Sequence, residues 1–151
     1  MIVKKVTNLI GNTPMLQLKM KNNNWNVYLK LEKFNPGGSM KDRMALNMIE
    51  QAEKTGKLKP GGTIIESSSG NTAIGLAIAS AIKGYKFIAI VDHHASKEKI
   101  DMIKAYGGET VVVGDGYRVN EVAVIEREQT AKRMSEEIEN SFFPNQADNF
   151  D

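Results

Sequence analysis

Apolar and polar positions alternate along the chain in a pattern that predicts parallel strands separated by helices. Residues 63–66, 86–91 and 109–113 are short runs rich in β-branched and other apolar side chains, as expected of buried strands. Between the first two runs, residues 73–82 form an alanine-rich stretch that ends at Gly84, which is typical of a helix and its C-terminal glycine. Strand, helix and strand in this order predict one βαβ unit.

A second βαβ unit follows directly. Ser96 is a suitable N-cap for a helix that ends at the glycine pair 107–108, before the third strand. Residues 117–140 are charged and helical in pattern, and residues 142–143 can form one more short strand. The predicted fold is therefore α/β, a twisted parallel sheet with helices on both faces and right-handed crossovers, in the manner of Rossmann-like folds.

The N-terminal part has a different pattern. Residues 15–19 alternate between apolar and polar, as in a half-buried strand, and residues 25–32 form a second strand candidate rich in β formers. Gly11 and Asn12 precede the first of these strands and can be a simple hairpin turn.

Bulk composition restricts the class of protein. The 151 residues are 41% hydrophobic and 25% charged, as in an ordinary globular domain. The net charge of +2 comes from 20 basic and 18 acidic residues that are interspersed, so we expect no nucleic-acid or membrane partner. Because cysteine is absent, disulfides, thiolate metal ligands and a cysteine nucleophile are excluded. A cleavable apolar leader and a membrane-length run are also lacking, which makes the cytoplasm the default location.

Lys41 is the strongest chemical candidate. It follows Gly37 and Gly38 in a turn and opens a helix that runs to Gly56. Helix starts disfavour cations, so an amine held there is either solvated or favoured in its neutral, nucleophilic form. A neutral lysine amine can bond to a carbonyl cofactor such as pyridoxal 5'-phosphate (PLP).

Polar groups also follow two of the predicted strands. Residues 67–72 join the strand at 63–66 to the next helix, where their hydroxyl and N–H groups can receive an anion. The alternative is that these Ser and Thr residues are ordinary N-caps. Gln146 follows the short strand at 142–143 in the same way, or is simply solvated.

The two histidines, His93 and His94, do not predict a metal site. Adjacent residues seldom bind one ion, and no histidine or thiolate stands at a ligand spacing from them. We expect a solvated loop there and no bound metal.

Four segments resemble one known family. Residues 35–43, Asn-Pro-Gly-Gly-Ser-Met-Lys-Asp-Arg, resemble the PLP-lysine motif of the cysteine synthase and cystathionine β-synthase family, which are β-replacing enzymes of PLP fold-type II. Residues 66–73, Glu-Ser-Ser-Ser-Gly-Asn-Thr-Ala, residues 145–149, Asn-Gln-Ala-Asp-Asn, and residues 11–14, Gly-Asn-Thr-Pro, are similar to the same family in the same order.

The resemblance implies a role for each matching residue. Lys41 would bind PLP covalently and act as the catalytic base, and Asn71 would hydrogen-bond the ring oxygen of the cofactor. The substrate carboxylate would be held by five residues: Ser68, Ser69, Gly70, Thr72 and Gln146. The implied reaction is β-replacement on an O-activated L-serine, by a transferase or lyase of amino-acid biosynthesis.

The resemblance also implies a domain division. Family members are roughly twice as long, about two ordinary domains, so the match is to their N-terminal half. Residues 1–40 would belong to the larger cofactor domain, residues 41–144 to a small α/β domain, and residues 145–151 to the start of the return. The phosphate-binding loop of the family lies beyond this span, and no Gly-x-x-x-x-Gly-Lys motif replaces it. We therefore expect a homo-oligomer such as a dimer, or pairing with a complementary C-terminal half.

Two other functions remain possible at this point. A non-catalytic, truncated paralogue could act as a binding or assembly partner. A nucleotide-binding Rossmann-like domain is the third hypothesis, although the Gly-x-Gly-x-x-Gly fingerprint is missing.

Overall fold

A four-stranded parallel sheet forms the centre of the protein. The computed structural model describes residues 2–21, 25–114 and 121–149. The sheet has the order β5-β4-β3-β6, and its strands are β3 (Thr63–Ser67), β4 (Lys86–Asp92), β5 (Glu109–Val113) and β6 (Ser141–Phe142). The parallel strands predicted from the sequence are confirmed. The last strand lies one residue earlier than predicted, because Ser141 and Phe142 pair with Thr63 and Ile64.

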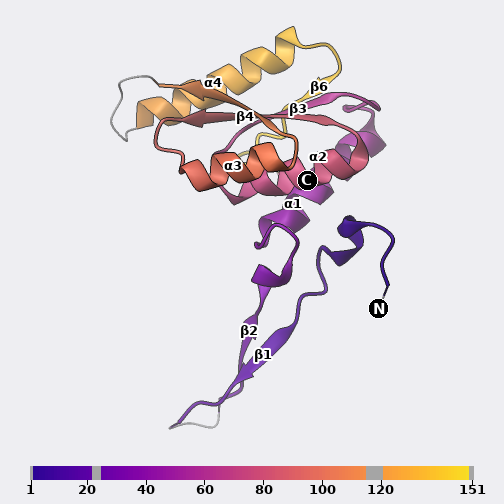
Figure 1. The fold of residues 1–151 in the computed structure, drawn as a ribbon, viewed down its shortest axis with the longest axis vertical. Helices are drawn as coiled ribbons and strands as arrows, with labels where there is room; N and C mark the ends of the chain where they lie inside the picture. The colour runs from indigo at the N-terminus through magenta and orange to yellow at the C-terminus, as the bar shows by residue number, and fades with distance from the viewer. Residues whose placement is uncertain (1, 22–24, 115–120, 150–151) are drawn as a thin grey trace.

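Helices cover both faces of this sheet (Figure 1). The helices α1 (Lys41–Thr55), α2 (Asn71–Lys83) and α3 (Lys97–Ala105) lie on one face, and α4 (Glu121–Glu137) lies on the other. The predicted doubly covered α/β fold is therefore confirmed. Within the predicted helix at 117–140, residues 117–120 lie outside the described residues, and the described helix ends at Glu137 so that Ser141 can reach the sheet.

Two apolar clusters hold the layers together. The larger cluster joins α1, α2 and α3 to the sheet through buried residues such as Ile49, Ile74 and Ile103. The smaller cluster packs Ala131 of α4 against Ile65 and Ile90 on the opposite face. Neighbouring strand residues point to opposite faces, which explains why a strand covered on both sides is apolar at nearly every position.

The helix boundaries follow the predicted signals. Gly56 and Gly84 end α1 and α2 in the left-handed conformation, with φ of 73° and 78°. The Ser96 side chain accepts a hydrogen bond from the Lys99 N–H and caps α3, as predicted. In the part of the chain that the structure describes, no helix combines the length and apolar character needed to cross a membrane.

The N-terminal strands stand apart from the main sheet. The strands β1 (Met15–Leu18) and β2 (Val27–Lys30) pair antiparallel with each other in a ribbon that extends away from the helices (Figure 1). Short 3-10 turns, η1 (Val6–Leu9) and η2 (Glu32–Phe34), flank the ribbon.

Two predictions about this region are wrong. The strand at 15–19 is not half-buried: Met15, Leu16 and Gln17 are exposed, because the two-stranded ribbon has no layer of the described chain packed against it. Gly11 and Asn12 are not the hairpin turn either, since the ribbon connects Leu18 to Val27 and both residues precede it.

Candidate active site

The order of the strands creates a switch point at the carboxyl end of β3. The chain passes from β3 outward to β4 and β5, and then returns to place β6 on the other side of β3. In open α/β sheets ligands bind at such a point, because the connections leaving neighbouring strands diverge there and leave a crevice. Two of the candidate segments from the sequence, residues 67–72 and residues 145–149, follow β3 and β6 at this point.

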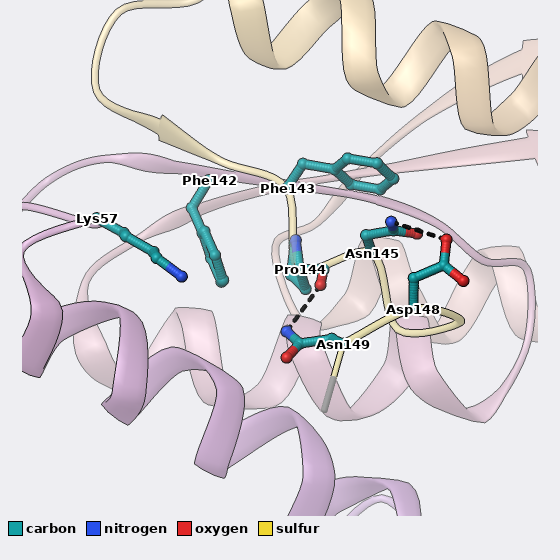
Figure 2. A pocket seen from close by; sticks show the side chains of 7 residues that line it. All are labelled: Lys57, Phe142, Phe143, Pro144, Asn145, Asp148 and Asn149. Atoms are coloured by element: carbon teal, nitrogen blue, oxygen red, sulfur yellow. Dashed lines mark hydrogen bonds between the residues drawn. The ribbon is translucent and has the colours of Figure 1, made fainter. Parts of the chain in front are cut away.

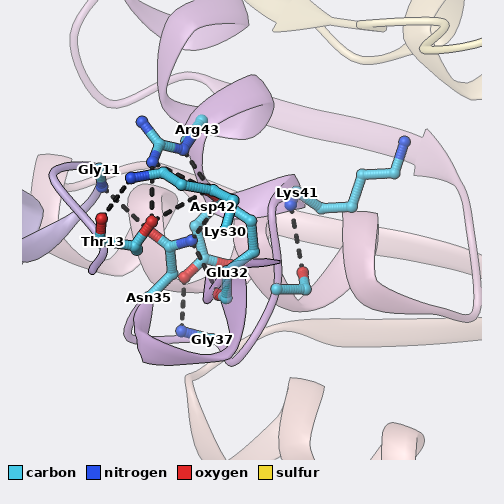
Figure 3. A network of polar contacts seen from close by, with 10 residues as sticks. Gly11, Thr13, Lys30, Glu32, Asn35, Gly37, Lys41, Asp42 and Arg43 are labelled. Atoms are coloured by element: carbon cyan, nitrogen blue, oxygen red, sulfur yellow. Dashed lines mark hydrogen bonds and ion pairs between the residues drawn. The ribbon is translucent and has the colours of Figure 1, made fainter. Parts of the chain in front are cut away.

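Lys41 is the first residue of α1, as predicted. Its backbone N–H donates to the Ser39 hydroxyl over 3.2 Å, and its Nζ lies 3.9 Å from the Met44 sulfur. Among the described residues Nζ has no carboxylate or carbonyl partner. In Figure 3 the Lys41 side chain extends away from the polar network that surrounds the preceding turn. The amine is thus available for a ligand.

Gly75 brings the start of α1 close to α2. A Cβ atom at Gly75 would lie 3.0 Å from the Lys41 carbonyl oxygen and 3.1 Å from the Ala45 Cβ. Because such contacts are tighter than ordinary van der Waals distances, only glycine permits this approach without a shift. Gly75 lies about one helical turn after Asn71, so the close approach places the backbone of Lys41 beside the beginning of α2. The sequence reading did not identify this role.

An ion pair fixes the turn that carries Lys41 (Figure 3). The Arg43 guanidinium contacts both oxygens of Glu32 at 3.0 Å, which is the bidentate geometry that suits this pair. Arg43 also donates to the Thr13 hydroxyl at 3.2 Å, and Asn35 donates to Glu32 at 2.7 Å. The hydrogen bond from Arg43 is the main cause that lowers the pKa of Glu32 to about 2.

The same network includes the N-terminal segment. The Gly11 N–H donates to the Asn35 side chain at 2.9 Å, and the Lys30 amine donates to the Thr13 carbonyl. Gly11 has a φ of 85°, and a Cβ there would lie 2.9 Å from Arg43. The segment at 11–14 therefore anchors the lysine turn, a function that the sequence match alone did not show.

Asp42 fixes the turn from the other side. It is 1% exposed, and its Oδ2 accepts the Gly37 N–H, while its Oδ1 has no hydrogen-bond partner among the described residues. Burial raises the pKa of Asp42 above its ordinary value. A Cβ at Gly37 would lie 2.5 Å from Asp42, so the motif requires glycine at this position.

The loop at 67–72 ends at an uncapped helix. Gly70 is the N-cap of α2, and no side chain of the described residues caps the helix. The Ser68 hydroxyl instead accepts the Gly70 N–H at 3.3 Å within the loop. The interpretation of these Ser and Thr residues as ordinary N-caps is therefore wrong for α2. The first N–H groups of the helix remain available to an anion.

The structure brings Thr72 and Gln146 together, although they are far apart in the sequence. The Thr72 hydroxyl donates to the Gln146 Oε1 atom over 2.6 Å. Thr72 is buried, and Gln146 is half-buried. The other loop candidates lie beside them, with Ser68 buried and both Ser69 and Gly70 half-buried.

Asn71 is placed less deeply than the other candidates. It is exposed, and its Oδ1 accepts a hydrogen bond from the Lys99 amine of α3 over 2.8 Å. Its Nδ2 group has no hydrogen-bond partner within the described part of the chain and can donate to a ligand. Lys99 was not a candidate in the sequence reading, because nothing in its local pattern distinguishes it from other surface lysines.

Glu66 is a buried carboxyl that sequence reasoning did not select. It is 1% exposed at the end of β3, where Oε1 accepts the Ser67 N–H at 2.9 Å and Oε2 accepts the Gln146 N–H at 3.2 Å. Burial raises the pKa of Glu66 to about 7. One signal could have identified it, namely a carboxylate that directly follows Ile64 and Ile65 in a strand predicted to be buried.

The segment after β6 borders a cavity of about 370 Å³ (Figure 2). Its lining residues are Lys57, Phe142, Phe143, Pro144, Asn145, Asp148 and Asn149, so the cavity lies beside the candidate residues and contains none of them. Two hydrogen bonds close the turn at its edge: Asn145 donates to Asp148 at 3.3 Å, and Asn149 donates to the Pro144 carbonyl at 2.8 Å. This turn determines where Gln146 lies.

His93 and His94 lie in an exposed turn after β4, as predicted, with ring centroids 4.1 Å apart. Across the described part of the chain, no group of three histidine or carboxylate side chains is arranged to hold a metal ion.

Comparisons with known proteins agree with the arrangement. Residues 6–151 match the model of the family described as pyridoxal-phosphate dependent enzyme. A putative cysteine synthase of Sinorhizobium fredii is 49% identical over 149 residues, which is 99% of this chain and 44% of that protein. A probable cysteine synthase of Bacillus subtilis is 46% identical over 150 residues, 98% of this chain and 47% of that protein.

A solved structure of an enzyme is similar to this chain in fold and in the part that it covers. The O-acetylserine dependent cystathionine β-synthase of Helicobacter pylori superposes with a TM-score of 0.86 at 32% identity, covering 99% of this chain and 48% of that one. The chain thus spans about half the length of the relatives that it matches, and it corresponds to their N-terminal part.

Proposed function

Because this chain belongs to the family of pyridoxal-phosphate dependent enzymes, we propose that it forms part of a cysteine-synthase-like enzyme acting on an O-activated L-serine. A sulfide, thiol or amine would replace the activated hydroxyl group, in a step of amino-acid biosynthesis such as cysteine formation. The names of the relatives support this class of reaction, since they include cysteine synthases and an O-acetylserine dependent enzyme.

The contact between Thr72 and Gln146 carries this proposal. It joins the two segments that leave β3 and β6 at the switch point, beside the uncapped start of α2. Hydroxyl, carboxamide and backbone N–H donors then converge on one place, as recognition of a carboxylate requires. We assign the amino-acid carboxylate to five residues: Ser68, Ser69, Gly70, Thr72 and Gln146.

The residues present fit PLP as the cofactor. Lys41 is half-buried and stands on a turn held by Asp42 and Arg43, and its amine lacks a carboxylate or carbonyl partner among the described residues. A rigidly held, uncommitted amine suits a covalent cofactor. When bound, PLP withdraws electrons from the substrate and makes its Cα proton acidic.

Each residue then has a defined task. Lys41 would hold the cofactor and afterwards, as a free amine, accept the proton from the substrate Cα. Asn71 would orient the cofactor ring through its carboxamide. The five carboxylate-binding residues would fix the Cα–H bond relative to Lys41, because a proton transfer needs its two heavy atoms within hydrogen-bond reach.

We also propose the domain division and the partners. Residues 1–40 would belong to a larger cofactor domain that carries the phosphate-binding loop, residues 41–144 to the small domain, and residues 145–151 to the return. The exposed apolar side chains of the ribbon support a covering partner, either a second copy of the protein or a complementary C-terminal half. They include Met15, Leu16, Tyr28 and Leu29.

Reductive labelling tests the function. Borohydride treatment of the PLP-loaded protein should leave a stable pyridoxyl group on Lys41, as located by peptide mass spectrometry. In Lys41→Ala the pyridoxyl label should be absent, and the protein should no longer release acetate from O-acetyl-L-serine, although it stays folded. Lys54→Ala is the matched control, because Lys54 is an exposed lysine in the last turn of the same helix.

The outcomes separate the hypotheses. Labelling at Lys41 supports the enzyme and argues against a non-catalytic binding module. Label spread over exposed lysines, unchanged in Lys41→Ala, would refute the assignment of Lys41.

A further inference from the structure

Glu66 lies between the two segments of the candidate carboxylate site. It is the penultimate residue of β3, and its side chain is almost completely buried. The loop at 67–72 begins at the next residue. An ionisable side chain is rarely buried so completely unless its oxygens have defined partners.

The partners of Glu66 come from both segments. Its Oε1 accepts the Ser67 N–H over 2.9 Å, and its Oε2 accepts the Gln146 N–H over 3.2 Å. Thr72, at the other end of the loop, donates to the Gln146 side chain over 2.6 Å. Gln146 is therefore held at its backbone by Glu66 and at its carboxamide by Thr72.

The turn before Gln146 is shaped to meet this carboxylate. Asn145 adopts a left-handed conformation with a φ of 48°, and its backbone N–H also interacts with Glu66. Successive N–H groups in such a turn form a concave site for an anionic group. Asparagine tolerates this conformation better than most residues with a side chain.

The carboxylate has a property that its amide analogue lacks. Both of its oxygens accept hydrogen bonds, whereas a glutamine side chain offers one oxygen and one NH2 group. Glu66→Gln would therefore place an NH2 group against one of the two backbone N–H donors. The overall size and burial of the side chain would stay nearly the same.

On the basis of the proposed function, we propose that Glu66 is a positioning residue that holds Gln146 and the loop at 67–72 in register for the substrate carboxylate. It does not touch the substrate. Its effect is transmitted through the Gln146 backbone and through the start of the loop.

Binding to the PLP-loaded complete enzyme tests this role at a pH above the raised pKa of Glu66, about 7, where both oxygens of its ionised carboxylate accept hydrogen bonds. O-acetyl-L-serine and O-acetylethanolamine, which lacks the carboxylate, are titrated while the cofactor absorbance is followed. Glu66→Gln should weaken binding of O-acetyl-L-serine by about tenfold, the loss expected for an impaired hydrogen bond to a charged group. Binding of O-acetylethanolamine and retention of PLP should be unchanged, a pattern that general loosening of the fold does not produce.

Glu53→Gln is the matched control. Glu53 on α1 also accepts hydrogen bonds at both oxygens, from Lys83 and Tyr85 at 2.8 Å each, but it lies outside the candidate site. This variant should bind both compounds as the wild type does. If Glu66→Gln does not fold, Glu66→Asp provides the same test, because it keeps the charge and shortens the reach to Gln146.

The results distinguish this inference from the proposed function. If the wild type binds O-acetyl-L-serine and Glu66→Gln binds it equally well, or loses both compounds equally, the positioning role is wrong. If the PLP-loaded wild type binds neither compound, the proposed function fails, and this inference fails with it.

Discussion

The stability of the protein should depend on pH through Glu66. Burial raises the pKa of this carboxyl from the ordinary 4.5 to about 7, and the negative charge of Glu128 on α4 contributes in the same direction. The N–H donors of Gln146 and Ser67 oppose this rise. Because the pKa is higher in the folded state, folding favours the protonated form.

The two pKa values of Glu66 determine how the stability of the protein changes with pH. The stabilisation from Glu66 is complete below pH 4.5 and is lost as the pH rises through about 7. A pKa difference of one unit corresponds to about 1.4 kcal/mol. The free energy of unfolding should therefore fall by roughly 3 kcal/mol as the pH rises from the unfolded pKa of Glu66 to its folded pKa.

Urea unfolding of the wild type and of Glu66→Gln between about pH 4 and pH 8.5 measures this loss. The difference in the free energy of unfolding between the two proteins should change by roughly 3 kcal/mol in favour of the variant as the pH rises. Contributions from distant carboxylates such as Glu32 and Glu53 should cancel in the difference. Comparing two proteins at each pH therefore isolates Glu66.

A second variant checks the cause of the raised pKa. Glu128→Gln removes a neighbouring negative charge, so the pKa of Glu66 should fall and the loss of stability should move to lower pH. A stability difference between the two proteins that stays constant between pH 4.5 and about 7, or that changes mainly outside this range, would refute the reasoning.

Three further predictions concern the scaffold of the site. Gly75→Val should destabilise the protein by about 1 to 3 kcal/mol in urea unfolding, because the new side chain overlaps the start of α1. The control Ala81→Val, at an exposed site of α2, should cost less than about 1 kcal/mol. Equal costs would contradict the close approach. Arg43→Gln should speed hydrogen exchange of the Gly11 and Asn35 amides, because it breaks the ion pair with Glu32. Arg133→Gln, which breaks an exposed ion pair with Glu137, should not. Unchanged protection of these amides in Arg43→Gln would contradict the role of the ion pair in anchoring the lysine turn. Ile74→Ala, at a fully buried position, should cost about 2 to 5 kcal/mol by leaving a cavity, and a loss below about 1 kcal/mol would argue against that packing.

Much of the fold could be predicted from local sequence signals. The parallel strands, the helices and their ends at Gly56 and Gly84 depend on short-range periodicity and on glycine conformations, and the structure confirms them. The placement of Lys41 at the first turn of α1 was predicted in the same way, because the glycine pair and the helical pattern lie next to each other in the chain. Its role toward PLP stays a prediction.

The exposure of the N-terminal ribbon could not be predicted from the alternation of apolar and polar residues alone. The pattern at 15–19 is typical of a strand with one covered face, but the burial of that face depends on another layer. Within the described chain no such layer packs against it, and Met15 and Leu16 are exposed.

The candidate carboxylate site was decided by tertiary structure. Local patterns selected Thr72 and Gln146 separately, but only the return of the chain to β6 beside β3 brings them within 2.6 Å across 74 positions in sequence. The same return supplies the Gln146 N–H to Glu66, a partner that the residues of β3 alone could not specify. Hydrogen bonds between distant segments depend on strand order, and strand order follows from the packing of all the layers together rather than from the residues of any one segment.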